Sequence, residues 1–169
     1  TEWQHWLIVV KPDKIKHQTG MLIIGAGDND GKIPDESPQL LVNYAKATGS
    51  IVAELSMVPN QPLTFKGEKE PRWEDAIIAY TWDKYLKTGE ERWPARMAMT
   101  KSAVAAMDAI QSLMEQQDIS ETVSKFVIAG ASKRGWTTWT TGAVDDRVEA
   151  MIPIVIDLLN LEASFKHHW

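Results

Sequence analysis

The chain has 169 residues, of which 44% are hydrophobic, and a formal net charge of −5, which suits one globular domain over 1–169 with a substantial core. A mildly acidic chain without a long Lys/Arg block argues against nucleic acid as the main partner, and no apolar run approaches the roughly 18 residues of a membrane span. The lack of cysteine excludes disulfides, a thiolate nucleophile and cysteine metal sites, and is compatible with any compartment.

Apolar runs and helically spaced apolar residues alternate along the chain, with glycine and proline between them. The expected elements are, in order, strands over 3–10 and 21–24, a helix over 37–48, a strand over 51–58, helices over 73–87 and 99–116, a strand over 125–129, a helix from a turn at 130–135 to 143, and a strand over 149–158. Gly49 and Gly89 stand where C-terminal helix caps belong. Such alternation predicts an α/β fold with a mostly parallel sheet and helices on both faces.

The segment from Phe126 to Trp136 carries most of the functional signal. An apolar strand leads into Gly130-Ala131-Ser132, and a helix follows at once. Serine hydrolases place their nucleophile in a sharp strand-to-helix turn of this kind, so that the hydroxyl projects above the edge of the sheet. The N–H of Lys133, at the start of the helix, is then a candidate donor to the oxyanion.

The glycine spacing departs from the common Gly-x-Ser-x-Gly pattern, because the second glycine comes one position later, at Gly135. Some esterase families of the α/β-hydrolase fold have this longer spacing, with a basic residue after the serine. The alternative is an ordinary turn in which Ser132 only caps the helix.

A second oxyanion donor is expected in a loop after an earlier strand. The loop Gly25-Ala26-Gly27 follows the predicted strand over 21–24 and is the candidate; a plain flexible turn is the alternative. The loop over 59–62 also follows a strand, and either shapes the cleft or is merely rigid.

Two further features have both a functional and a structural interpretation. The side chains of Lys133 and Arg134 could bind an anionic group of the substrate, or could be exposed or paired with acidic residues. The eight tryptophans indicate either an aromatic-rich core or a lined substrate cleft.

Six segments follow one another in an order that is familiar: Val58–Leu63, Glu74–Trp82, Trp93–Arg96, Met99–Ala103, Gly130–Trp139 and Ile152–Asp157. Together they closely resemble the PhoPQ-activated pathogenicity-related protein family, over nearly the whole chain. Members of that family are mostly bacterial and often exported. The resemblance implies an α/β-hydrolase fold and favours a secreted or periplasmic location, but it hardly constrains the substrate.

Family members are much longer than this chain, and the catalytic triad of the fold runs in the order serine, acid, histidine. The usual acid and histidine are therefore expected beyond Trp169. This predicts a partial domain that is inactive alone, and whose open sheet edge self-associates or is covered by the remainder of the protein.

Within the chain, Asp157 is a minor candidate for the acid, and His167 or His168 for the base. The alternatives are a solvated or ion-paired carboxylate and a surface histidine pair, and the spacing of these residues does not indicate a metal site. His5 and His17 precede the serine and have no supporting context.

The sequence thus predicts acyl transfer to water. Ser132 attacks an ester or amide carbonyl of a small molecule or peptide, a histidine acts as base, and no cofactor is needed. The rival hypothesis is a secreted, non-catalytic binding or signalling protein on the same scaffold, with the tryptophans as its recognition surface.

Overall fold

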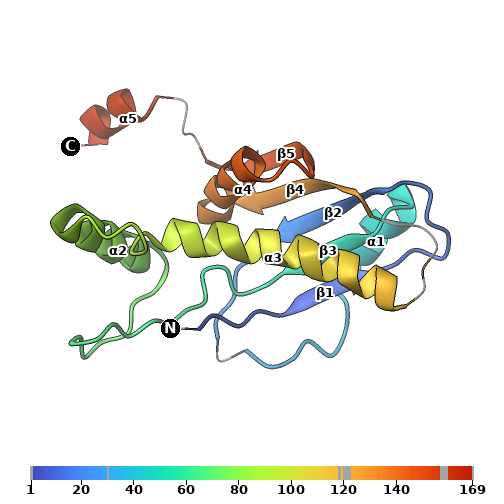
Figure 1. Cartoon of the computed structure of the whole chain (residues 1–169), viewed down its shortest axis with the longest axis horizontal. Coiled ribbons are helices and arrows are strands. Elements are labelled where there is room, and N and C mark those ends of the chain that lie inside the picture. Colours follow the sequence, from blue (N-terminus) through green and yellow to red (C-terminus); the bar gives the residue numbers. More distant parts are fainter. Residues whose placement is uncertain (1, 30, 118, 120–122, 157–159, 169) are drawn as a thin grey trace.

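A central sheet of five strands organises the computed structural model of the protein (Figure 1). The structure describes residues 2–29, 31–117, 119, 123–156 and 160–168; of His168 it describes the backbone alone. The strands are β1 (Leu7–Val10), β2 (Thr19–Ile24), β3 (Val52–Leu55), β4 (Lys125–Ala131) and β5 (Val148–Ile154), and their spatial order is β1-β3-β2-β4-β5.

The sheet is mixed, and the expectation of a mostly parallel sheet was wrong on this point. β1 runs antiparallel to β3, whereas β3, β2, β4 and β5 pair in parallel. A helix between two strands carries the chain back to the end where the first strand began, which keeps the strands parallel. No helix lies between β1 and β2. The chain therefore enters β2 from the end where β1 stopped, and the two strands run in opposite directions.

The described residues form five helices: α1 (Gln39–Thr48), α2 (Glu74–Thr88), α3 (Ala95–Gln116), α4 (Lys133–Val144) and α5 (Leu161–His168). The first four were expected, although α3 begins earlier than residue 99. Gly49 and Gly89 end α1 and α2 with φ of 68° and 71°, a left-handed conformation that glycine adopts without strain. The sequence did not predict α5, whose side chains over 161–167 are exposed.

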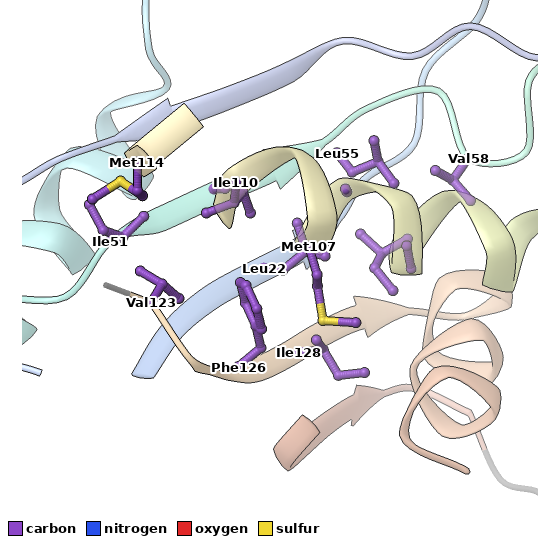
Figure 2. Packing of buried hydrophobic residues seen from close by; sticks show 14 of the residues in the cluster. Leu22, Ile51, Leu55, Val58, Met107, Ile110, Met114, Val123, Phe126 and Ile128 are labelled. Atoms are coloured by element: carbon purple, nitrogen blue, oxygen red, sulfur yellow. The ribbon is translucent and has the colours of Figure 1, made fainter. Parts of the chain in front are cut away.

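Successive residues of a strand point to opposite faces of the sheet, so the two faces carry separate buried clusters. α1 covers one face, where Leu41 and Ala45 pack with Val52 of β3. α3 covers the other face, and Figure 2 shows its side chains meeting those of the strands. This larger cluster includes Leu22, Met107, Ile110, Phe126 and Ile128. Helices therefore cover both faces of the sheet, and β4 is anchored in the core.

The tryptophans that the structure describes are all half-buried or exposed, and none belongs to the core. The core is aliphatic, with Phe126 as its one fully buried aromatic among the described residues. The prediction of an aromatic-rich core is therefore wrong. Trp3 and Trp6 instead line cavities near the start of the chain.

β5 has a neighbour on one side only in the described part of the sheet, and it exposes Met151, Ile152 and Ile154. Covering of this edge, by a second copy or by further polypeptide, stays a prediction. None of the described helices has the length and apolar character needed to cross a membrane.

Candidate functional site

Ser132 lies in a tight turn between the end of β4 and the start of α4 (Figure 1). Its φ of 54° and ψ of −117° place a non-glycine residue in a sparsely populated region of backbone conformation. The predicted arrangement of strand, turn and helix is confirmed. Strain of this kind tends to occur at functional sites, where the surrounding structure holds it in place.

The hydroxyl of Ser132 does not cap α4, because no side-chain capping hydrogen bond forms. The backbone N–H of Ser132 donates to the carbonyl of Ile154 at 2.8 Å, which fixes the turn against β5. Among the described residues, no group bonds to Oγ of Ser132, and the residue is half-buried. The capping alternative therefore does not describe this turn, and the hydroxyl is available to react.

The two glycines around the serine sit where β4 and α4 cross closely. A Cβ atom at Gly130 would lie 2.5 Å from the carbonyl oxygen of Arg134, and one at Gly135 would lie 3.0 Å from the carbonyl oxygen of Gly130. Each glycine thus makes room for backbone of the other element. This explains the longer glycine spacing, since Gly135, four residues along the chain from Ala131, is the helical position that faces the strand.

The loop after β2 lies at the same edge of the sheet as Ser132. β2 and β4 pair in parallel, with Ile24 opposite Gly130, so both chains leave the sheet side by side. The N–H of Gly25 is occupied, because it donates to the carbonyl of Leu55 at 2.8 Å. Ala26 and Gly27 are exposed and donate to no acceptor within the described chain.

The orientation of these two N–H groups follows from their own peptide planes. The carbonyl of Gly25 accepts from Val58 N at 3.1 Å, and that of Ala26 accepts from Met57 N at 2.9 Å. In a trans peptide the N–H points opposite to the C=O. The N–H groups of Ala26 and Gly27 therefore point away from the segment after β3, and β4 with its serine turn lies on that other side of β2.

The two basic side chains that follow Ser132 form ion pairs within the protein. Arg134 is buried and makes two hydrogen bonds to Glu74, Nη2 to Oε1 at 2.6 Å and Nη1 to Oε2 at 3.1 Å, and its Nε donates to the carbonyl of Val58. Lys133 Nζ lies 3.1 Å from Glu74 and 2.9 Å from Asp75. The geometry favours the alternative in which both side chains pair with acidic residues.

Glu74 is the partner that both basic residues share. Burial acts to raise the pKa of its carboxyl, but hydrogen bonds from Arg134, Gln61 and Lys133 outweigh burial and lower the pKa to about 2. The carboxylate is therefore ionised at any ordinary pH. A substrate anion would have to displace it to reach Arg134.

A third cation supports the turn from the side of α3. Arg96 donates from Nη1 to the carbonyl of Lys133 at 2.8 Å, and its guanidinium lies 3.9 Å from the ring centroid of Trp136. Burial lowers the pKa of Arg96 to about 10, so it stays charged near neutral pH. This contact fixes the first turn of α4, the turn whose N–H groups face the oxyanion in the predicted mechanism.

Of the residues predicted as acid and base, the structure describes only the side chain of His167. Asp157 and the side chain of His168 lie outside the described residues. His167 is exposed on α5, and His17 is exposed after β1. No group of three or more metal-binding side chains gathers within the part of the chain that is described.

A serine–histidine pair occurs away from Ser132, and nothing in the sequence indicated it. His5 Nε2 lies 2.9 Å from Oγ of Ser102, and Nδ1 donates to the carbonyl of Ser56 at 3.0 Å. Burial lowers the pKa of His5. Ser102 lies inside α3, however, where the helix uses the neighbouring backbone N–H groups, so these are not free to bind an oxyanion. The pair ties the first segment of the chain to α3.

Two cavities, of about 540 and 550 Å³, lie beside the first residues of the chain. The first is mainly apolar and lies against α3, where Trp3, His5 and Ser102 line it. The second touches Asn29 and Asn60, near the glycine loop. Ser132 lines neither cavity, so neither can be taken as its substrate cleft.

A model of the PhoPQ-activated pathogenicity-related protein family matches residues 1–169. The chain belongs to this family. One relative is the autocrine proliferation repressor protein A of Dictyostelium discoideum, which is 39% identical over 169 residues; these cover 99% of this chain and 34% of the relative. The chain thus spans about a third of the length of this curated relative.

The family match confirms the resemblance inferred from the six segments. Three residues that matter to the site of this PhoPQ-related chain were still missed: Gln61, Glu74 and Arg96. Each lies in one of those segments, but nothing in the sequence indicates which side chains meet. Glu54 was missed as well; burial raises the pKa of its carboxyl, which lies against the Cα of Gly25.

Proposed function

We propose that the protein is a serine hydrolase of the α/β-hydrolase type, which transfers the acyl group of an ester or amide to water, with Ser132 as the nucleophile. The observation that carries the proposal is the strained φ of 54° at Ser132, in a turn between a parallel strand and a helix, with a hydroxyl that bonds to no described group. Glycine adopts a positive φ without strain, and strain at a non-glycine residue tends to occur at functional sites.

The arrangement of backbone donors supports the same chemistry. The N–H of Lys133 is in the first turn of α4, where no intrahelical acceptor exists for it. The free N–H groups of Ala26 and Gly27 point toward the same side of β2. As Ser132 attacks, these donors stabilise the negative charge that develops on the carbonyl oxygen. A histidine base accepts the serine proton and later gives it to the leaving group.

A fluorophosphonate probe on the intact protein tests the proposal, since such probes bond covalently to activated serines. We expect stoichiometric labelling that Ser132→Ala abolishes. Ser102→Ala is the matched control, because it removes the serine that contacts His5, and it should leave the labelling unchanged. Labelling that persists in Ser132→Ala, or that is lost only in Ser102→Ala, would refute the assignment.

A second candidate function is a secreted signalling protein without catalysis. The observation that favours it is the name of the Dictyostelium relative, an autocrine proliferation repressor. The two functions separate in a proliferation assay with purified intact protein. If Ser132→Ala repressed proliferation fully, and the fluorophosphonate probe did not label Ser132 in the wild-type protein, the results would support the signalling role alone.

A further inference from the structure

A chain of hydrogen bonds links the glycine loop after β2 to the serine turn. Gln61 Nε2 donates both to the carbonyl of Gly27 at 3.1 Å and to Oε1 of Glu74 at 2.8 Å. Glu74 in turn binds Arg134, two residues after Ser132. The link therefore runs from Gly27 through Gln61 and Glu74 to the first turn of α4.

Gln61 is held so that its amide has one orientation only. Its Oε1 accepts from the backbone N–H of Glu74 at 2.9 Å, so its NH₂ group must face Gly27 and the carboxylate. Its own carbonyl accepts from Asn29 N at 2.5 Å, at the far end of the glycine loop. Gln61 is 4% exposed. Both polar atoms of its side chain and its backbone carbonyl thus bond to one of the two segments that it joins.

Glu74 carries a backbone strain that this link accounts for. Its φ of 44° is unfavourable for a residue with a side chain, yet it begins a regular helix. The conformation lets its N–H and its carboxylate both meet Gln61 while the carboxylate also meets Arg134. A helix whose first residue faced only solvent would have no such contacts to make and would not need the positive φ.

We propose that Gln61 and Glu74 are positioning residues, which hold the N–H groups of the glycine loop at the distance from Ser132 that an oxyanion hole requires. The inference rests on the proposed function. Oxyanion donors must sit about 2.7–3.1 Å from a position that the oxygen occupies only in the transition state. Here the donors lie on two separate loops, so something must set their spacing, and Gln61 and Glu74 bridge the two directly.

Two chromogenic esters report on this spacing in the intact protein: p-nitrophenyl acetate and its thionoester, in which sulfur replaces the carbonyl oxygen. Sulfur accepts hydrogen bonds poorly, so an oxyanion hole accelerates the oxygen ester far more than the thionoester. Gln61→Met cuts the bond to Gly27 and leaves the pair of Arg134 with Glu74 in place. Glu74→Gln weakens the link from its other end.

We expect both variants to lose the preference for the oxygen ester by about tenfold or more, because loss of one oxyanion donor typically lowers turnover by about 10²–10³. Glu68→Gln is the matched control: its carboxylate binds Arg72, at a similar side-chain exposure of 31% against 35% for Glu74, and touches neither loop. It should keep the wild-type preference.

A purely structural role would lower stability, or slow the hydrolysis of both esters equally and leave the ratio of their rates unchanged. An unchanged ratio in folded Gln61→Met would overturn the inference. The proposed function would still stand if turnover depended on Ser132. If Glu74→Gln fails to fold, the ratio in Gln61→Met decides. A wild-type protein in which neither ester is hydrolysed by Ser132 would overturn both the inference and the proposed function.

Discussion

Gly130→Ala probes the close crossing of β4 and α4 that sets the turn at Ser132. The new Cβ would lie 2.5 Å from the carbonyl oxygen of Arg134 and 2.7 Å from its carbonyl carbon, where ordinary contact is 3.4–4 Å. Both atoms are backbone, so no side-chain rotation relieves the contact. α4 would have to move away from β4 by about 1 Å, against a close-packed interior.

The expected loss follows from that geometry. Overpacking of a core costs about 1–3 kcal/mol, and a backbone obstacle belongs at the upper end, so we expect the free energy of unfolding to fall by about 3 kcal/mol. The same shift would move the N–H of Lys133, and fluorophosphonate labelling of Ser132 should slow. Urea unfolding of the intact protein, followed by tryptophan fluorescence, measures the first effect.

Gly142→Ala is the control within the same helix. There the three atoms nearest to the new Cβ, the closest at 2.2 Å, all belong to the side chain of Met151, which is partly exposed on β5 and can rotate away. Alanine also has a helix propensity about 1 kcal/mol better than glycine. The unfolding free energy should be unchanged or higher. If Gly130→Ala is no more destabilising than Gly142→Ala, the crossing is not tight and the reasoning fails.

Three further outcomes are expected for the residues around the turn. In thermal denaturation, the free energy of unfolding of Ser132→Gly should be about 1 kcal/mol higher than that of Ser132→Ala, because glycine adopts the positive φ without strain. Equal stabilities of the two variants would contradict the strain. Arg134→Met should lose about 2–3 kcal/mol, because Glu74 loses both hydrogen bonds from the guanidinium and keeps only Lys133 as a cationic partner. The guanidinium of Arg96 forms no ion pair within the described chain, so Arg96→Met should change stability by less than about 1 kcal/mol, and urea unfolding compares the two. The pKa of Glu74 is lowered from 4.5 to about 2, so its carboxylate stabilises the fold above pH 4.5 and this contribution is lost as the pH falls toward 2. After screening at its partly exposed position it amounts to about 1–2 kcal/mol, and a stability gap between wild type and Glu74→Gln that did not narrow from pH 7 to pH 3 would speak against it.

The features that the sequence predicted correctly are local ones. The turn at Ser132 depends on a strand, a few small residues and a helix that are adjacent in the chain, and the ends of α1 and α2 depend on single glycines. α5 failed for the opposite reason. Its apolar pattern is a single pair, Leu161 and Phe165, which is too short to indicate a helix in the sequence.

The features that it missed join residues far apart in the chain. His5 meets Ser102 across 97 positions and Arg134 meets Glu74 across 60. A single sequence does not show which of these residues pair. For Arg134, any acidic residue near the sheet edge could have been the partner. The antiparallel β1 is a similar case, since direction depends on what the chain does between two strands.

The Lys-Arg pair after Ser132 was compatible with two roles, and the geometry favours the structural one. Basic side chains beside a nucleophile resemble a receptor for a substrate anion, but a buried guanidinium needs a counter-charge before any ligand arrives. Glu74 supplies it, and in doing so connects α4 to the loops after β2 and β3. With the N–H of Ser132 bonded to Ile154 and the carbonyl of Lys133 bonded to Arg96, the strained turn is held from β5, from α3 and from these loops. Such anchors let the surrounding structure hold a non-glycine residue at a positive φ. The basic residues therefore serve the proposed chemistry through geometry, by fixing the hydroxyl and the oxyanion donors, and charge reversal of a substrate should affect turnover far less than loss of any one anchor.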